Sequence, residues 1–305
     1  MSRIFVILNA SSGNGCEEAL AEHVRELFLS AGMPAEVALA RGGDEIAAMI
    51  LHAIAQSADV IVAGGGDGTV SVVAAALVDR DIALGVLPLG TMNHFAKDLR
   101  LPLALEAAVQ QIAAGTRIQV DVGEVNGRVF VNNSSLGMYP DIVRHRDLQQ
   151  RTIGRGKWLA FFWATVAALR RYPFLRVCLS VRGLQHHRLT PFVFIGNNEY
   201  RIEGFALGGR ESLTTGRLSL YTAQRPGRMR LLQFGLRALA GRLKQARDFD
   251  ALVATEIVVE SQHQHLRVAT DGEVTVMQAP LRYRIRPACL TVLAAAPPGC
   301  PEQAD

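Results

Sequence analysis

Asp67 lies in the stretch GGGDGT, residues 64–69, which follows one apolar run and precedes another. A strand, a glycine turn and a helix start are the elements of a phosphate-binding loop. Glycines let backbone N–H groups face a ligand, and a helix N-terminus adds partial positive charge. Asp67 argues against simple dinucleotide binding, since a carboxylate repels a pyrophosphate unless a cation intervenes, and Thr69 stands where a third glycine is expected. The alternative is a tight turn in which Thr69 caps the helix, and the local sequence leaves both open.

A second stretch, ATDGEVTV at 269–276, places two carboxylates two residues apart. Side chains alternate across a strand, so Asp271 and Glu273 are expected to point the same way if this stretch is extended. A carboxylate in such a place can accept the proton of an attacking hydroxyl group. The alternative is a plain hairpin with Asp271-Gly272 in its turn.

The first third of the chain alternates strand-like and helical patterns. Leu20, Val24, Leu27 and Phe28 recur at helical spacing, and four apolar runs read as buried strands: Ile4–Leu8, Ala35–Leu39, Asp59–Ala63 and Ile82–Leu87. Buried strands joined by helices predict a parallel sheet covered on both faces, which binds ligands at the carboxyl ends of its strands. Two more polar, glycine-bearing stretches fall at that edge, NASSGNG at 9–15 and LPLGTMNHFAKDL at 87–99. Three such loops together predict a nucleotide site.

The alternation of strand-like and helical patterns ends after Gly115. IQVDVGEVNGRVFVNN contains two strand-like runs around Asn126-Gly127, a strong hairpin signal. Further runs predict strands at Leu175–Val181, Pro191–Ile195, Arg217–Tyr221, Ile257–Glu260, Leu266–Ala269, Val274–Met277 and Leu281–Ile285. Two helices are expected near 157–171 and 229–247. We therefore predict an α/β nucleotide-binding domain at 1–118, a mainly antiparallel β domain at 119–295 and a frayed tail at 296–305.

Composition narrows the class of protein. The 305 residues are 49% apolar, which excludes wholesale disorder, and the net charge of +4 mildly favours anionic partners. The four cysteines have no metal-binding spacing and read as reduced thiols of a cytoplasmic protein. The longest lipophilic segment, Trp158–Leu169, is shorter than the roughly 20 residues that a membrane span needs. No transmembrane segment is expected.

GGGDGT, followed by PLGT-x-N-x-FA at 88–96, resembles the diacylglycerol kinase catalytic-domain family of bacterial lipid kinases, in the wider group with NAD kinases and phosphofructokinases. FVNNSSLGMYPDIV, IGNNEY, ESLTTGRLSLY and TDGE follow in the family's order, so the likeness covers nearly the whole chain. It implies an N-terminal α/β domain, a C-terminal β-sandwich domain and a site in the cleft between them.

The resemblance also implies residue roles. ATP would be held by three loops, represented here by Asn9, Ser11, Ser12 and Gly13, by Gly65, Gly66, Asp67, Gly68 and Thr69, and by Thr91 and Asn93. Asp67 would orient Mg²⁺ directly or through water. Glu273 matches the family's proton acceptor, with Asp271 beside it. The implied reaction is transfer of the γ-phosphate of ATP to a lipid hydroxyl.

Three positions depart from the family pattern. Val72 replaces a usual glutamate, and Thr215 replaces an aspartate that binds a structural Mg²⁺ in the second domain. His94 stands where diacylglycerol-type members commonly have aspartate, which puts the lipid acceptor in doubt. The alternatives are therefore a kinase for another alcohol, such as a sphingoid base or NAD, and an inactive nucleotide- or lipid-binding protein.

A lipid kinase must reach a bilayer, and two basic segments could contact one peripherally at the inner face of the membrane. The segment 229–247 has leucines on one helical face and basic residues on the other, although a core-packed helix is the favoured interpretation. A second cluster of basic residues lies at 144–157. Neither has the interleaved aromatics of a single-strand nucleic-acid platform, so no nucleic acid partner is expected. A homodimer is left open.

Overall fold

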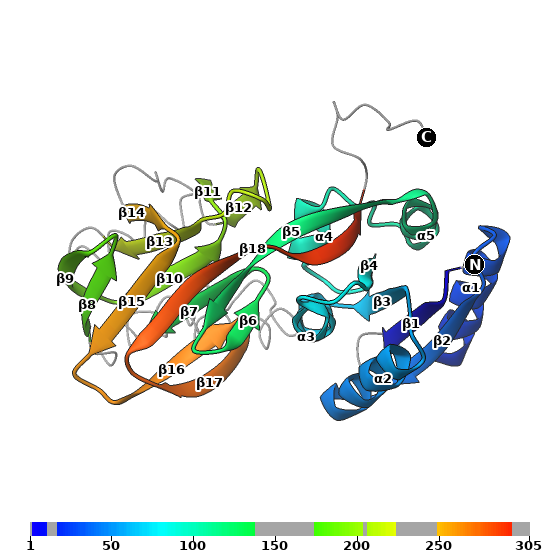
Figure 1. The fold of residues 1–305 in the computed structure, drawn as a ribbon, viewed down its shortest axis with the longest axis horizontal. Coiled ribbons are helices and arrows are strands. Elements are labelled where there is room, and N and C mark those ends of the chain that lie inside the picture. Colours follow the sequence, from blue (N-terminus) through cyan, green and yellow to red (C-terminus); the bar gives the residue numbers. More distant parts are fainter. Residues whose placement is uncertain (1, 11–16, 138–173, 204–205, 224–248, 295–305) are drawn as a thin grey trace, which may run out of the picture. The chain divides into compact units, whose positions relative to one another are not determined.

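The computed structural model describes residues 2–10, 17–137, 174–203, 206–223 and 249–294. The chain forms two compact units, one of residues up to Val122 together with the segment from Pro287 onward, the other of Gly123–Arg286. Two long strands, β5 (Thr116–Val125) and β18 (Leu281–Ala294), each run from one unit into the other (Figure 1).

The first unit is built from alternating strands and helices: β1 (Ile4–Asn9), α1 (Glu17–Ser30), β2 (Ala35–Ala40), α2 (Gly43–Ala55), β3 (Val60–Gly65), α3 (Asp67–Leu77), β4 (Ala83–Pro88), α4 (His94–Asp98) and α5 (Leu105–Ala114). The strands pair in parallel in the order β2-β1-β3-β4, and the end of β18 adds a parallel partner to β4 through Val292 and Leu84. This confirms the predicted α/β domain and its parallel sheet.

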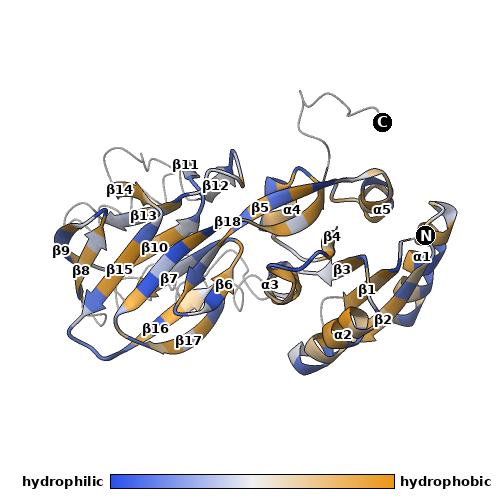
Figure 2. Ribbon diagram, viewed as in Figure 1, coloured by the Kyte–Doolittle hydropathy of each residue, from blue (hydrophilic) through white to orange (hydrophobic). Residues whose placement is uncertain are grey.

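Both faces of this sheet are covered because its strands are apolar on both sides. Val6 and Leu8 face a cluster with Val24 and Phe28 of α1 and with the buried residues of α5. The alternate residue Phe5 points the other way and meets His52 of α2 edge-on, at 6.1 Å between ring centroids. Figure 2 shows orange and blue residues together on α1 and α2, as expected of helices that cover a sheet with one side only.

The second unit is antiparallel. Its strands after β5 are β6 (Arg128–Phe130), β7 (Asn133–Gly137), β8 (Leu175–Val181), β9 (Leu184–Thr190), β10 (Phe192–Asn197), β11 (Tyr200–Glu203), β12 (Ala206–Arg210), β13 (Leu218–Ala223), β14 (Phe249–Ala254), β15 (Glu256–Ser261), β16 (His265–Thr270) and β17 (Glu273–Gln278). One sheet has the order β14-β13-β10-β7-β16-β17, a second places β18, β15, β8 and β9 side by side, and β11 and β12 pair with each other. The antiparallel β domain is thus confirmed.

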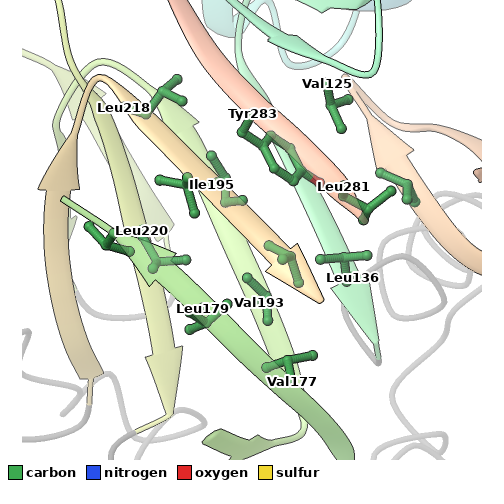
Figure 3. Packing of buried hydrophobic residues seen from close by; sticks show 14 of the residues in the cluster. Val125, Leu136, Val177, Leu179, Val193, Ile195, Leu218, Leu220, Leu281 and Tyr283 are labelled. Atoms are coloured by element: carbon green, nitrogen blue, oxygen red, sulfur yellow. The ribbon is translucent and has the colours of Figure 1, made fainter. Parts of the chain in front are cut away.

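The two larger sheets of this unit share one core. Leu136, Ile195 and Leu220 come from the first sheet, and Leu179, Ile257 and Leu281 from the second, among other buried residues. Figure 3 shows side chains from both sheets, among them Leu136, Leu179 and Leu281, pointing into the same space. Tyr283 of β18 is buried there, and its hydroxyl lies 3.1 Å from Ser134 Oγ. Burial raises the pKa of Tyr283, although the hydrogen bond with Ser134 opposes the shift.

Two features of these strands differ from the sequence predictions. The run after the Asn126-Gly127 hairpin is not one strand, because Val131 and Asn132 form a bend between β6 and β7. The last strand continues well past Ile285, through Pro287, and returns to β4. The observed division therefore differs from a single boundary at 118, since the end of β18 completes the sheet of the first unit.

Candidate active site

The three strands that precede the predicted ligand-binding loops, β1, β3 and β4, end at the same edge of the sheet in the first unit. The parallel registers place Leu8 opposite Gly64 and Gly64 opposite Leu87, so β1, β3 and β4 end at the same level. Asn9 Nδ2 donates a hydrogen bond to Thr69 Oγ1 at 2.9 Å, which ties the end of β1 to the glycine loop. Ser11, Ser12 and Gly13 lie outside the described residues.

The glycines of these loops serve two different purposes. A Cβ on Gly90 would lie 2.4 Å from the Cα of Gly66, and a Cβ on Gly65 would lie 2.6 Å from Thr69 Oγ1. These glycines are needed because neighbouring chain segments approach closely. Gly68 is exposed, and a Cβ there would have no described atom within 4 Å. Gly68 is therefore the glycine that leaves the backbone open to a ligand.

Asp67 is the first residue of α3, so its carboxylate stands at the positive end of a helix dipole. Its Oδ1 accepts a hydrogen bond of 3.3 Å from the backbone N–H of Phe95 in α4. The N-cap of α3 is Gly66, and it has no side-chain cap bond. The alternative interpretation of Thr69 as the helix cap is wrong, because Thr69 lies inside α3; its hydroxyl oxygen accepts the bond from Asn9.

This arrangement fits a Mg²⁺ ion that is bound together with phosphates. Magnesium in nucleotide sites usually takes one or two carboxylates and completes its shell with phosphate oxygens and water. Asp67 supplies one such carboxylate, held beside the N–H groups of the first turn of α3, which favour anions. Within the described ranges no cluster of three or more metal-binding side chains occurs, so an all-protein metal site is not formed there.

Asn93 holds the loop after β4 in shape. It adopts a left-handed backbone conformation (φ 51°) and is buried. Its Nδ2 donates to the carbonyls of Pro88 at 3.0 Å and Gly90 at 2.8 Å, and its Oδ1 accepts from the N–H of Gly90 at 3.1 Å. The side chain predicted to contact a nucleotide is thus used within its own loop, whereas Thr91 is exposed.

In the second unit, Asp271 and Glu273 do not share a strand. Asp271 lies in the turn between β16 and β17 with a φ of 49°, and Glu273 is the first residue of β17. The expectation that both point the same way, as on an extended strand, is wrong because the hairpin turn intervenes. The Asp271 carboxylate accepts hydrogen bonds from the N–H groups of Val131, Asn132 and Asn133 at 2.8, 2.8 and 3.0 Å.

Glu273 is the more accessible of the two acids, with a side chain that is 58% exposed. Arg128 of β6 donates from Nη2 to Glu273 Oε2 at 2.5 Å. Arg128 could not be predicted from the sequence, because nothing in its local pattern shows that residue 128 and residue 273 meet. The structure therefore gives the turn one carboxylate held by backbone amides and one that faces outward beside an arginine.

The second-domain cation implied by the family does not fit the described residues. Thr215 donates to Asn198 Oδ1 twice, from its backbone nitrogen at 2.9 Å and from its hydroxyl at 2.6 Å. A neutral hydroxyl and a neutral amide are poor substitutes for a carboxylate toward a hard cation. The loop that would hold the ion is instead closed by these hydrogen bonds.

Two further departures from the family pattern lie in α3 and α4. Val72 is half-buried in α3, and His94 is exposed at the start of α4. The predicted helices at 157–171 and 229–247, the basic cluster at 144–157 and the tail at 296–305 lie outside the described residues. Within the described ranges, no helix is long and apolar enough to cross a bilayer.

Comparisons with known proteins match both units. A model of the diacylglycerol kinase catalytic domain matches residues 3–125, and a model of the YegS C-terminal NAD kinase beta sandwich-like domain matches residues 141–294. A probable lipid kinase YegS-like protein of Enterobacter sp. (strain 638) is 35% identical over 136 residues, which is 43% of this chain and 44% of the relative. Its counterpart from Klebsiella pneumoniae (strain 342) is 33% identical over 135 residues, with 43% and 44% covered. The matched part of the chain thus spans less than half of the length of these relatives.

Solved structures share the fold over nearly the whole length. A diacylglycerol kinase from Bacillus anthracis str. Sterne has a TM-score of 0.71 at 18% identity, covering 96% of this chain and 97% of its own. A putative diacylglycerol kinase from the same strain has a TM-score of 0.74 at 19% identity, with the same coverage. At these identities the likeness shows the fold alone.

Proposed function

Since this chain belongs to the diacylglycerol kinase catalytic-domain family of lipid kinases, we propose that it transfers the γ-phosphate of ATP to a hydroxyl group of a diacylglycerol-like lipid. The reaction would take place in the cytoplasm, with peripheral contact at the membrane surface where the acceptor lies. The observation that carries the proposal is the position of Asp67, which stands at the N-terminus of α3 next to the exposed Gly68.

The phosphate end of the substrate is assigned to the first unit. Amide groups at the start of α3 and the open backbone at Gly68 are suited to phosphate oxygens. Mg²⁺, when bound, would neutralise charge on the β- and γ-phosphates, and Asp67 is the residue that would hold it. The bond from Asn9 to Thr69 supports this role, because it fixes the glycine loop against β1.

The proton of the acceptor is assigned to Glu273. A lipid hydroxyl is a poor nucleophile, and a carboxylate can accept its proton as the oxygen attacks the γ-phosphorus. The new O–P bond forms while the bond to the bridging oxygen of ADP breaks, and the proton passes to Glu273. Exposure of Glu273 supports this assignment, whereas Asp271 is better suited to positioning because three amides already occupy its carboxylate.

The test is transfer of γ-labelled phosphate from ATP to an acceptor, measured in the solvent-extractable product for lipids and in the aqueous phase for NAD. Purified protein with Mg²⁺ would be given separate mixed micelles of diacylglycerol, monoacylglycerol, phosphatidylglycerol, ceramide and sphingosine, with NAD as a water-soluble acceptor. We expect labelled phosphatidic acid from diacylglycerol, lost in Glu273→Gln and retained in Glu260→Gln, an exposed carboxylate of β15. Label in another lipid or in NAD would replace the proposed acceptor. ATP binding without labelled product from any acceptor would instead favour the inactive binding protein.

A further inference from the structure

The bend at Val131 and Asn132 needs hydrogen-bond partners from outside the strand ladders. Both residues are buried, with exposed fractions of 0% and 4%, and they lie between β6 and β7 rather than within either strand. Buried backbone N–H and C=O groups are costly to leave unpaired. Side chains from elsewhere in the second unit supply most of the partners.

The N–H groups of the bend all face one anion. Asp271 Oδ2 accepts from Val131, and its Oδ1 accepts from Asn132 and from Asn133. In return the backbone N–H of Asp271 donates to the carbonyl of Asn133 at 2.9 Å. The turn that ends two residues later at Glu273 is therefore fastened to the bend.

Two oxygens of the bend contact a buried cation. Arg210, at the end of β12, is 6% exposed. Its Nη1 donates to the carbonyl of Val131 at 2.6 Å, and its Nη2 donates to Oδ1 of Asn132 at 2.9 Å. The guanidinium lies 5.3 Å from the ring centroid of Tyr200, whose hydroxyl donates to the carbonyl of Asn132 at 3.0 Å.

The bend thus lies between opposite charges, with its N–H groups toward Asp271 and two of its oxygens, the Val131 carbonyl and Asn132 Oδ1, toward Arg210. Asn197 also donates to the bend, from Nδ2 to the Val131 carbonyl and from its backbone nitrogen to the Asn132 carbonyl, each at 2.9 Å. Charge-assisted hydrogen bonds are roughly twice as strong as neutral ones, and linked hydrogen bonds polarise one another. The bend also joins β6, which carries Arg128, to β7. A shift of the bend would therefore move both groups that fix Glu273, its ion-pair partner Arg128 and its turn neighbour Asp271.

We propose that Arg210 is a positioning residue for Glu273, acting through the bend and Asp271. This inference rests on the proposed role of Glu273 as proton acceptor. Arg210 is not expected to touch either substrate, because its guanidinium is buried against backbone. Losing it should loosen the bend and the 270–273 turn together and lower kcat, while the phosphate-binding loops of the first unit stay intact.

The experiment compares Arg210→Met, Arg210→Lys and Asp271→Asn with wild type, and takes Arg176→Met, an exposed position of β8, as the control. Hydrogen exchange is followed by mass spectrometry on peptides that cover 128–137 and 268–275. Kinetics give kcat and KM for ATP separately. Arg210→Met should speed exchange in both peptides about tenfold, the factor expected when a buried charged hydrogen bond is lost. It should lower kcat by about the same factor with KM for ATP unchanged, and Arg210→Lys should restore part of both because the cation is kept.

The outcomes separate this inference from the proposed function. Faster exchange in 128–137 alone, or faster exchange in both peptides with unchanged kcat, would make Arg210 merely structural and overturn the proposal. If the wild type transfers no phosphate, the proposed function fails, while the exchange of 268–275 in Arg210→Met still decides whether Arg210 orders the turn. If Arg210→Met does not fold, Arg210→Lys takes its place in the comparison. The linkage would then be refuted if Arg210→Lys changed neither exchange nor kcat and Asp271→Asn left exchange unchanged.

Discussion

Arg128 and Glu273 form an ion pair across the second unit, with Nη2 and Oε2 2.5 Å apart, although 145 positions separate them in the chain. Neither side chain is buried, so the pair is expected to add little to stability. Its effect should instead be on where the Glu273 carboxylate points.

Replacing Arg128 should therefore change turnover more than stability. We expect Arg128→Gln to lower kcat several-fold, since a misplaced base transfers protons less efficiently. The melting temperature and KM for ATP should stay close to wild type, and Arg176→Gln should change none of the three. Steady-state kinetics with thermal melting would check this, and an unchanged kcat would show that the ion pair does not orient Glu273.

Removing the Asp67 carboxylate should weaken metal use. In Asp67→Asn the helix start remains, but the negative ligand for Mg²⁺ is lost, so we expect kcat to fall about 100-fold or more and the Mg²⁺ concentration for half-maximal rate to rise. Asp44→Asn is the matched control, because Asp44 lies in the first turn of α2. Magnesium titrations of the initial rate would reveal the shift. An unaltered titration curve would remove Asp67 from the metal assignment.

Replacing each of two glycines with alanine should distinguish a glycine needed for packing from a glycine needed for ligand access. Gly90→Ala is expected to lower the melting temperature, because its Cβ would press on the backbone of Gly66. Gly68→Ala should leave the melting temperature near wild type, since the added Cβ meets no described atom and alanine suits a helix. It should nevertheless raise KM for ATP. Equal effects of the two variants on melting would contradict this division.

The loop around Thr215 should need no cation. Thr215→Val removes the hydroxyl bond to Asn198 and should cost about 0.5–1.5 kcal/mol of unfolding free energy, whereas Thr255→Val, an exposed position, should not. Without nucleotide, chelation by EDTA should leave the wild-type unfolding curve unchanged. Stabilisation of the nucleotide-free wild type by Mg²⁺ that disappears in Thr215→Val would show that a metal does bind there.

Tyr283 should make the free energy of unfolding depend on pH in the alkaline range. Its pKa is raised in the folded state by burial, so the unfolded chain loses the phenolic proton first, near its ordinary pKa of about 10. Stability is therefore fully present below that pH and falls as the pH rises above it, by up to about 1.4 kcal/mol per pH unit for this group. Tyr283→Phe should show a shallower fall in denaturant unfolding, with a remainder from Tyr221, whose pKa burial also raises. The same slope in both proteins would exclude Tyr283 as its source.

Local sequence was sufficient where local chemistry decides the structure. The apolar strands of the first unit, with glycine and polar residues at their ends, indicate both the parallel sheet and the edge where its loops meet. The Asn126-Gly127 hairpin is confirmed, because both residues take the positive φ values that a tight two-residue turn requires. These features depend on a few neighbouring residues, which a single sequence displays directly.

Other features depend on partners far along the chain. The break of the strand at Val131 and Asn132 follows from Asp271 and Arg210, which no nearby pattern reveals. Asn93 looks like a ligand contact in sequence, but its bonds to Pro88 and Gly90 are visible only once the loop is folded. For the same reason, the sequence shows that Asp271 and Glu273 are close together in the chain. It does not show that the Asp271 carboxylate is bound to backbone amides while the Glu273 side chain is exposed.

The return of β18 to β4 has a consequence for synthesis on the ribosome. Val292 pairs with Leu84, and Leu293 belongs to the core that α1 and α5 cover, yet both are made after the entire second unit. Until then β4 has an open edge toward the position of β18, and unpaired edges favour aggregation. A nascent chain that ends within the second unit therefore carries a first unit that is not yet closed. Because the end of β18 is translated after the second unit, the fold of the N-terminal unit is the last to be completed.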